Sequence, residues 1–122
     1  MNNSEYSAEN LYELAPVGYL TVSDKGVVLN ANKAVLTMLG VDRDILLGKQ
    51  ISDFILGEDQ EKYFLHFKEC FESYALQPLE MRMVRSDASV IWVDFKFTPL
   101  SQGEYWINLS NISGKKFAED AL

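Results

Sequence analysis

The sequence predicts an α+β domain built on one five-stranded antiparallel sheet, with helices packed on one face and an N-terminal helix on the other. The first observation is the order of the expected elements, which runs helix, two strands, several helices and three strands. Strands joined by such short connections pair as antiparallel hairpins, and separate runs of strands and helices are typical of this class. The second is size, because 122 residues with 48% hydrophobic residues suit one globular domain.

The first half of the chain predicts a hairpin between short helices. The elements expected there are a helix over 4–14, strands over 18–23 and 27–31, a helix over 32–39, and single-turn helices over 44–47 and 51–55. Ser4 or Ser7 can cap the first helix, and Pro16 disfavours helix at the residue before it. Gly26 supplies the hairpin turn, and Gly40 ends the helix that follows.

The second half predicts one long helix followed by three strands. We expect the helix over 58–74 and the strands over 79–85, 90–98 and 105–112. At 100° per residue, one stripe of the helix collects Tyr63, Phe64, Phe67, Phe71 and Tyr74. Alternation along the strands directs Leu79, Met81, Met83, Ile91, Val93, Phe95 and Phe97 to the inner face of the sheet. The aromatic stripe and these strand residues should therefore meet in the core.

The same alternation places two tryptophans, Trp92 and Trp106, on the outer face of the sheet. Two large aromatic side chains on one exposed face need a cover. The N-terminal helix, with Leu11, Tyr12 and Leu14, is the expected lid, either on its own sheet or on the sheet of a second copy. We therefore predict a homodimer formed through this helix and the outer sheet face.

Charge and composition exclude several functions. The chain carries 18 Asp+Glu against 11 Lys+Arg and has a net charge of −7, so no basic surface is available for nucleic acid. One cysteine, Cys70, cannot form an intrachain disulfide, and one histidine, His66, cannot build a His-rich metal site, so we expect no metal. The start lacks the features of a signal peptide, and no stretch approaches the ~20 apolar residues of a membrane span. We expect a cytoplasmic segment without membrane contact, whose parent protein can still be membrane-anchored.

An ordered set of short motifs resembles the PAS domain family. The motifs are DKGVVLNANKA at 24–34, LG at 39–40, LLGK at 46–49, ISDFILGED at 51–59, VIWV at 90–93, LSNIS at 109–113, KK at 115–116 and AE at 118–119. Each motif alone is weak, but the set in this order and spacing is specific. The resemblance covers about residues 9 to 122.

The resemblance implies a cytosolic sensory module of a signal-transduction protein, such as a sensor histidine kinase of a two-component system or a diguanylate cyclase. It divides the chain into an N-terminal helix at 1–15, a PAS core at 16–113 and the start of an exit helix at 114–122. Phe117 has the spacing of a coiled-coil position in that helix. We expect Asn111 and Phe117 to relay a rearrangement of the sheet to a covalently linked output domain.

Three positions carry more specific expectations. Asn111 stands where the family commonly has Asp, so a neutral hydrogen bond is expected there in place of a charge-assisted one. Ala88 follows Asp87 where the family usually has Gly, so we expect this turn to avoid a positive φ. Asn32 stands where a strand becomes a helix, and it is expected to cap that helix rather than to bind a ligand.

The residues do not favour a haem or a cysteinyl-flavin cofactor. Light-oxygen-voltage domains, which resemble this family, form their flavin adduct through the cysteine of a Gly-Arg-Asn-Cys run, and Ile51 stands at that position here. Cys70 lies on the long helix, out of that register, and suits a small buried hydrophobe. Haem-binding members ligate iron through a histidine on the long helix, but that position falls nearer Phe64 than His66. His66 lies about 100° from the centre of the aromatic stripe, which suits a surface or rim position.

Two functions stay open for the inner face. One is the binding of an uncoloured small ligand or a partner, in a pocket lined by Phe64, Phe67, Phe71, Met81, Met83, Phe95 and Phe97. The other is a ligand-free dimerisation and relay module, whose core these side chains simply fill. The segment is not expected to be an enzyme, because its only thiol is isolated and no phosphate-binding loop occurs. The acids at 53, 58 and 59 suit the start of a helix.

Overall fold

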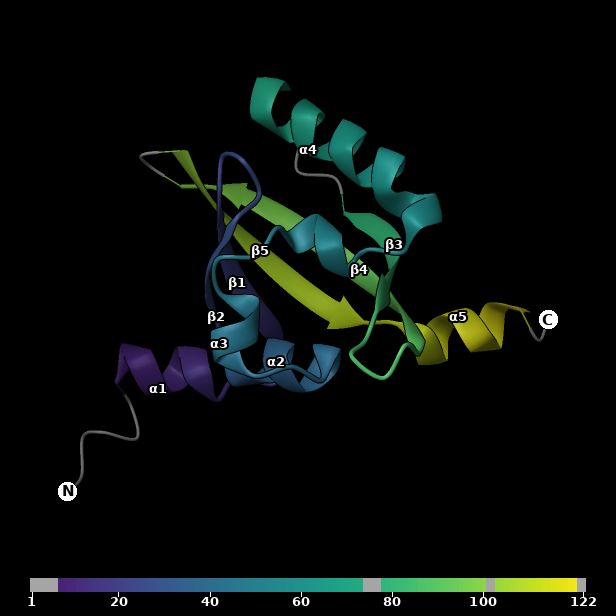
Figure 1. Cartoon of the computed structure of the whole chain (residues 1–122), viewed down its shortest axis with the longest axis horizontal. Helices are drawn as coiled ribbons and strands as arrows, with labels where there is room; N and C mark the ends of the chain where they lie inside the picture. The colour runs from purple at the N-terminus through teal and green to yellow at the C-terminus, as the bar shows by residue number, and fades with distance from the viewer. Residues whose placement is uncertain (1–6, 74–77, 101–102, 121–122) are drawn as a thin grey trace.

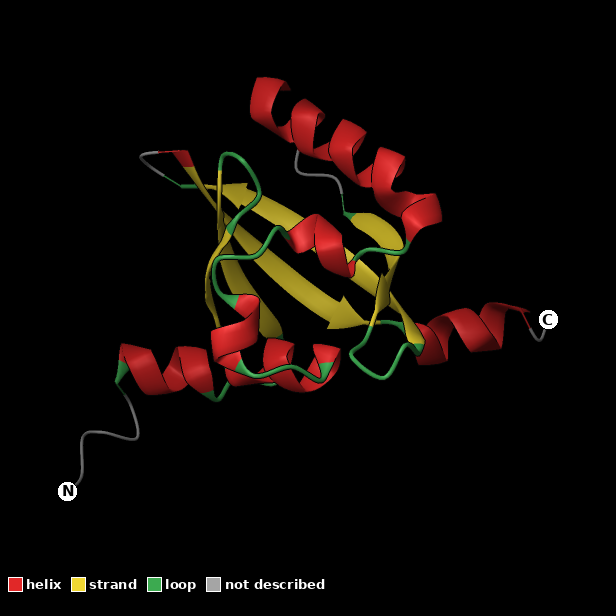
Figure 2. Cartoon of the chain, viewed as in Figure 1, coloured by secondary structure: helices red, strands yellow, loops and turns green. Residues whose placement is uncertain are grey.

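The computed structural model describes residues 7–73, 78–100 and 103–120, with side chains for all of these except 70–73 and 120. Tyr74 and the side chains of Cys70 and Phe71 lie outside the described residues. Five strands form one antiparallel sheet in the order β2-β1-β5-β4-β3 (Figure 2). The strands are β1 (Gly18–Ser23), β2 (Val28–Ala31), β3 (Leu79–Val84), β4 (Val90–Pro99) and β5 (Glu104–Asn111). The predicted α+β fold is confirmed.

Helices flank and connect the strands as expected. They are α1 (Ala8–Glu13), α2 (Lys33–Leu39), α3 (Arg43–Leu46), the 3-10 turns η2 (Ile51–Phe54) and η3 (Gly57–Asp59), α4 (Gln60–Ser73) and α5 (Ser113–Asp120). Ser7 caps α1 by accepting the backbone N–H of Asn10 at 3.1 Å. In Figure 1, α1 and α5 lie toward opposite ends of the longest axis. Among the described helices, none is long and apolar enough to cross a membrane.

The core lies between the helices and one face of the sheet. Along β1, β3, β4 and β5, buried and half-buried or exposed residues alternate, as the period of a strand requires. All seven strand residues predicted to face inward are buried, and the core also includes Leu20, Val22, Val35, Leu39, Ile51, Tyr63, Ile107 and Leu109. Trp92 and Trp106 are half-buried at outward positions.

The side chain of Asn32 holds the N-terminal segment to the sheet and to α2. It is fully buried. Its Oδ1 accepts the backbone N–H groups of Tyr19 at 3.0 Å and Val35 at 3.3 Å. Its Nδ2 donates to the carbonyl oxygens of Tyr12 and Val17, both at 2.9 Å. Both donors and both acceptor sites of the amide are therefore used. The predicted cap of α2 is confirmed, and the same side chain also anchors the end of α1.

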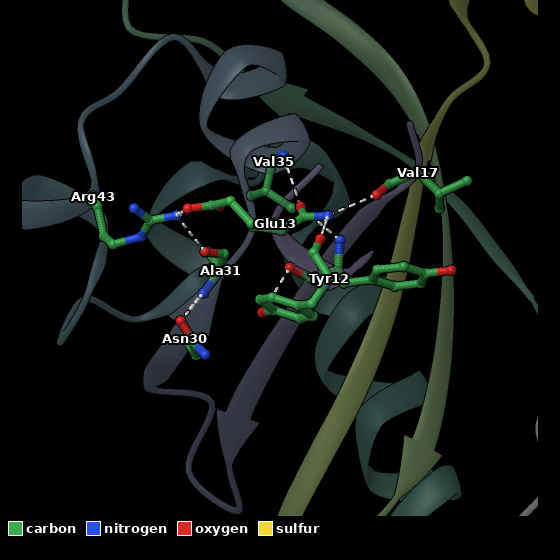
Figure 3. A network of polar contacts seen from close by, with 9 residues as sticks. Tyr12, Glu13, Val17, Asn30, Ala31, Val35 and Arg43 are labelled. Atoms are coloured by element: carbon green, nitrogen blue, oxygen red, sulfur yellow. Dashed lines mark hydrogen bonds and ion pairs between the residues drawn. The ribbon is translucent and has the colours of Figure 1, made fainter. Parts of the chain in front are cut away.

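Arg43 provides a second tie between α1 and the core. One of its guanidinium nitrogens, Nη2, lies 2.6 and 2.9 Å from the two carboxylate oxygens of Glu13 and donates to the carbonyl of Ala31 at 3.1 Å (Figure 3). Nearby, the hydroxyl of Tyr12 donates to the carbonyl of Tyr19 at 3.2 Å. Burial is the main cause that raises the pKa of Tyr12 to about 12, so this hydroxyl stays a donor at neutral pH. These contacts position the start of the domain against β1 and β2.

The turn between β3 and β4 differs from the expectation. Ala88 adopts a φ of 69°, so the expectation that this turn avoids a positive φ is wrong. The turn is tight: the N–H of Ala88 donates to the carbonyl of Arg85 at 2.9 Å, and that of Arg85 donates to the carbonyl of Ser89 at 2.8 Å. Asp87 supports it by accepting the N–H of Ser89 at 2.9 Å. The two strands thus enforce a left-handed residue even where glycine is missing.

We expect Ala88→Gly to stabilise the domain by about 1 kcal/mol, because a residue with a Cβ is strained in the left-handed region. Urea unfolding followed by circular dichroism measures the change. Ala34→Gly, in the first turn of α2, is the matched control and should destabilise by up to about 1 kcal/mol. Destabilisation by both substitutions would contradict the strain at position 88.

We expect Asn32→Asp to destabilise the domain by about 3 kcal/mol, since it removes both donors and aims a buried carboxylate at two carbonyl oxygens. The acceptor side is preserved, so the loss should fall first on α1, as faster amide exchange over 8–13. Asn30→Asp is the control, because Asn30 is exposed and its side chain serves only as an acceptor for the N–H of Ala31. Equal effects of the two substitutions would contradict the role of Asn32.

Candidate functional site

A layer of aromatic rings fills the space between α4 and the sheet. Tyr63 and Phe67 project from α4 onto Phe95 and Phe97 of β4, and neighbouring ring centroids lie 5.5 to 6.3 Å apart. Phe67 also contacts Tyr105 of β5, at 5.1 Å. These separations are those of rings in direct contact. Over the described part of α4, the chain's own aromatic side chains thus pack against the inner face.

The residues predicted to line a pocket do not all face this layer. Met81, Met83, Phe95 and Phe97 are buried, and Phe67 is packed against the core. The side chain of Phe71 lies outside the described residues. Phe64 is 52% exposed, so its predicted inward position is wrong.

The error at Phe64 is one of helical phase. Asp59, immediately before α4, is fixed at the edge of β3 by hydrogen bonds with Arg82. Residues four and seven or eight positions later, which are Tyr63, His66 and Phe67, then face the same side. Phe64 is turned about 100° from Tyr63 and points away from the sheet.

Two polar atoms enter this layer without a hydrogen-bond partner among the described residues. They are the hydroxyl oxygen of Tyr63 and Nε2 of His66. Burial raises the pKa of Tyr63 well above its usual range, which keeps the phenol neutral. The His66 ring lies 5.7 Å from that of Phe97, so His66 is half-buried at the rim of the layer. The pocket residues predicted from the sequence omitted Tyr63, although its spacing from Phe67 indicates the inward face.

The N-terminal helix covers one end of the outer sheet face. The Tyr12 ring lies 5.5 Å from that of Trp106 and 6.1 Å from that of Tyr19, and Tyr19 and Trp106 are 5.1 Å apart. The indole N–H of Trp106 donates to Asn108 at 2.7 Å. On the other side of this cluster, Leu11 and Leu14 are 61% and 67% exposed. Tyr12 thus packs on the chain's own sheet, while two leucines of the same segment face outward.

Trp92 lies at the other end of that face. Trp106 pairs with Thr98 of β4, six residues from Trp92 and about 20 Å away along the strand. Trp92 is contacted by Arg82 and by Lys116 of α5, at 5.2 and 4.9 Å from its ring centroid. The two tryptophans therefore have separate covers, one from each terminal helix.

The predicted relay residues lie where β5 passes into α5. Oδ1 of Asn111 accepts the backbone N–H of Ser113 at 2.9 Å, which is the neutral hydrogen bond expected there. The hydroxyl oxygen of Ser113 accepts the N–H of Trp92 at 3.0 Å, so the first residue of α5 is tied to β4. Phe117 is 78% exposed on α5. The geometry gives Asn111 a structural link to the helix and leaves Phe117 free to contact another chain or segment.

Open grooves lie outside the aromatic layer. One of about 500 Å³ runs between α1 and α2 and is lined by Glu13, Leu14, Ala15, Pro16, Lys33, Ala34, Thr37, Met38 and Asn111. Another of about 460 Å³ follows α4 beside His66 and is lined also by Glu58, Glu61, Lys62, Leu65, Glu69 and Leu79. The sequence did not predict either groove, because each is formed by residues from separate elements.

Asp59 and Glu58, at the start of α4, share Arg82 as a structural partner. The hydrogen bonds from Arg82 lower the pKa of Asp59, which is therefore ionised at neutral pH. Within the described part of the chain, no group of three or more His, Cys, Asp and Glu side chains could hold a metal ion. This arrangement suits a helix terminus locked to a strand edge.

Solved structures share this fold at low sequence identity. The PAS domain of an HTR-like protein from Haloarcula marismortui superposes with a TM-score of 0.74 at 22% identity, covering 85% of this chain and 88% of that one. A PAS domain of a LuxR-family transcriptional regulator from Burkholderia thailandensis, in complex with ethanol, gives 0.77 at 14% identity, covering 88% and 98%. A domain of a sensory box sensor histidine kinase/response regulator from Geobacter sulfurreducens gives 0.70 at 19% identity, covering 83% and 88%.

The family assignment comes from the sequence. No curated protein matches the chain at a significant level. The family model for the PAS domain matches residues 16–113, which include every strand of the sheet and the helices from α2 to α4. The chain therefore belongs to the PAS domain family, whose members are sensory domains typical of signalling proteins.

Proposed function

We propose that this chain is a relay module of a signal-transduction protein, with a core filled by its own side chains. The observation that carries the proposal is the continuous contact of Tyr63, Phe67, Phe95 and Phe97 between α4 and the sheet. A core packed in this way transmits displacement, because close-packed interiors have low compressibility. The input is then a change in the contacts of the N-terminal segment, and the output leaves through α5.

Homodimerisation through α1 supplies that input. Leu11 and Leu14 are exposed on the segment that carries Tyr12, whose ring packs against Trp106 on the outer face. A symmetric dimer uses the same patch on both copies, and a second α1 would cover both leucines. α1 has only six residues, and packing rather than its own propensity must stabilise it.

The output is a domain that follows in the parent protein. Phe117 is exposed on α5. The helix itself extends away from the sheet (Figure 1). A paired helix continuing from α5 would join this domain to the output domain of a histidine kinase or a diguanylate cyclase. These are the two kinds of parent protein that the family resemblance implies. The similar domain from Geobacter sulfurreducens belongs to a sensor histidine kinase/response regulator, which supports this class of output.

The second candidate function is the sensing of a small ligand at the inner face. The hydroxyl oxygen of Tyr63 and Nε2 of His66 are the observation that favours it, because buried polar atoms are usually hydrogen-bonded. The two residues project from the same side of α4, and the hydroxyl of Tyr63 lies near Gly26 of the β1–β2 turn. The similar domain from Burkholderia thailandensis is in complex with ethanol, a ligand of the size and polarity that such atoms would hold.

Tyr63→Phe separates the two functions, because it removes only the unpaired hydroxyl. With a filled core, it should leave the stability unchanged or raise it by about 1 kcal/mol, since a buried unpaired donor is lost. Urea unfolding measures stability, and native mass spectrometry of the purified chain should give the polypeptide mass alone. An additional small mass that is retained by the original chain and lost in Tyr63→Phe would overturn the filled core. Phe67→Leu is the control for packing and should destabilise in either case.

Leu11→Glu tests the dimer. We expect the original chain to elute as a dimer in size-exclusion chromatography with light scattering, and the substituted chain to elute as a monomer, because a charge replaces apolar contact area. Leu65→Glu is the matched control, since Leu65 is 58% exposed on α4, away from the outer face. A monomeric original chain at high concentration, with α1 still folded, would overturn the proposed interface.

A further inference from the structure

A salt bridge closes the free edge of β3. The carboxylate of Asp59 accepts three hydrogen bonds from Arg82: from the backbone N–H at 2.8 Å, from Nε at 2.9 Å and from Nη2 at 2.7 Å. The N–H of Leu56 donates to the carbonyl of Arg82 at 3.0 Å. Charge-assisted bonds of this kind are short and directional. The segment that leads into α4 is thereby fixed to an edge strand that would otherwise be unpaired.

The same arginine reaches around the edge to the outer face. Arg82 and Trp92 lie directly opposite each other in β3 and β4. Arg82 directs its backbone polar groups to Asp59 and Leu56, so the two residues form a non-hydrogen-bonded pair, in which side chains approach most closely. The Arg82 guanidinium lies 5.2 Å from the centroid of the Trp92 ring. One side chain therefore contacts both the start of α4 and the outer face.

Lys116 of α5 contacts the same tryptophan and a neighbouring acid. Its Nζ lies 4.9 Å from the centroid of the Trp92 ring and 2.5 Å from a carboxylate oxygen of Glu80. Glu80 precedes Arg82 by two residues on the same face of β3, so their Cα atoms are about 7 Å apart. Two cations, one from β3 and one from α5, are thus within reach of one ring and one carboxylate.

We propose that Arg82 is a switch that couples the start of α4 to the docking of α5. With Arg82 held by Asp59, Glu80 is left to Lys116 and, at a longer distance, to Lys115, and α5 is docked. When α4 moves away from the edge, Arg82 is released, pairs with Glu80 and displaces Lys116. The same charges then have two discrete arrangements, which is what a conformational relay requires. This inference rests on the relay function proposed above and gives it a route.

Amide exchange of the full chain, measured by mass spectrometry over residues 113–120, tests the switch. Asp59→Asn should release Arg82 and make α5 exchange about fivefold faster, the size expected for losing an ion pair on an aromatic ring. Adding Arg82→Met removes the competitor for Glu80, so exchange in the double variant should return to within about twofold of the original rate. A simple loss of stability would instead make the double variant faster still.

Each of the two ion pairs has a matched control variant at a neighbouring residue of the same charge. Glu58→Gln removes a neighbouring acid that is well exposed and whose contact with Arg82, at 3.5 Å, is longer than that of Asp59. It should leave the amide exchange rate of α5 unchanged. Lys115→Met removes the adjacent lysine, whose nearest contact with Glu80 is 3.4 Å. Lys115→Met should raise the amide exchange rate of α5 less than Lys116→Met does. If Asp59→Asn does not fold, Asp59→Ser replaces it, because serine can still accept the Arg82 N–H.

Two results would overturn the switch. One is an α5 exchange rate in Asp59→Asn equal to the original, and the other is no recovery on adding Arg82→Met. The measurement needs no ligand, partner or output domain. Failure of the switch is therefore distinguishable from failure of the relay function, which the oligomer and core measurements test separately.

Discussion

The buried amide of Asn32 is the constraint on which the rest of the domain depends. Two donors and two acceptor sites serve four backbone groups that come from α1, the segment after it, β1 and α2. No other neutral side chain of this size has both functions in one plane. Because each of those backbone groups would be costly to bury alone, the amide of Asn32 couples the hairpin, the first helix and α2 to one another. The position of α1 on the outer face follows from this amide.

The two terminal helices are held at opposite ends of the outer sheet face by different kinds of interaction. At the β1 end, α1 contributes an aromatic ring and is held by neutral hydrogen bonds and by the pairing of Arg43 with Glu13. At the β3 end, α5 is held by Lys116 on Trp92 and by its pairing with Glu80, together with short backbone links to β4. Ion pairs with partly exposed partners contribute little each and exchange readily. The second attachment is therefore the easier one to release.

The sequence predicts the sheet and most helices because alternation and capping are local signals. Asn32 and Gly40 bound α2 as expected, and the inward residues of β3 and β4 are buried as predicted. The prediction for Phe64 is wrong because aromatic residues lie on several sides of α4, so the sequence of the helix alone does not determine which side faces the sheet. The hydrogen bonds between Asp59 and Arg82 determine the rotation of the helix. These two residues are 23 positions apart in the sequence. Ala88 shows that strand pairing can outweigh a local preference against positive φ. The contacts of Arg82 with Trp92 depend on strand register, which a single sequence does not specify.

The aromatic layer and the unpaired polar atoms beside it have a common explanation in the position of α4. Tyr63 occupies the centre of the helix face that Asp59 sets, so its ring packs into the layer while its hydroxyl has no hydrogen-bond partner among the described residues. An unpaired hydroxyl costs about 1–3 kcal/mol, less than a ring of that size contributes by burial and aromatic contact. The helix is therefore held by packing on one side. At its start it is held by the bonds of Asp59 with Arg82 and by the amide of Gln60, which donates to the carbonyl oxygens of Ser52 and Ile55. If the bonds between Asp59 and Arg82 are lost, this end of the helix can move away from the sheet, and the edge of β3, rather than the centre of the sheet, is where that movement acts first.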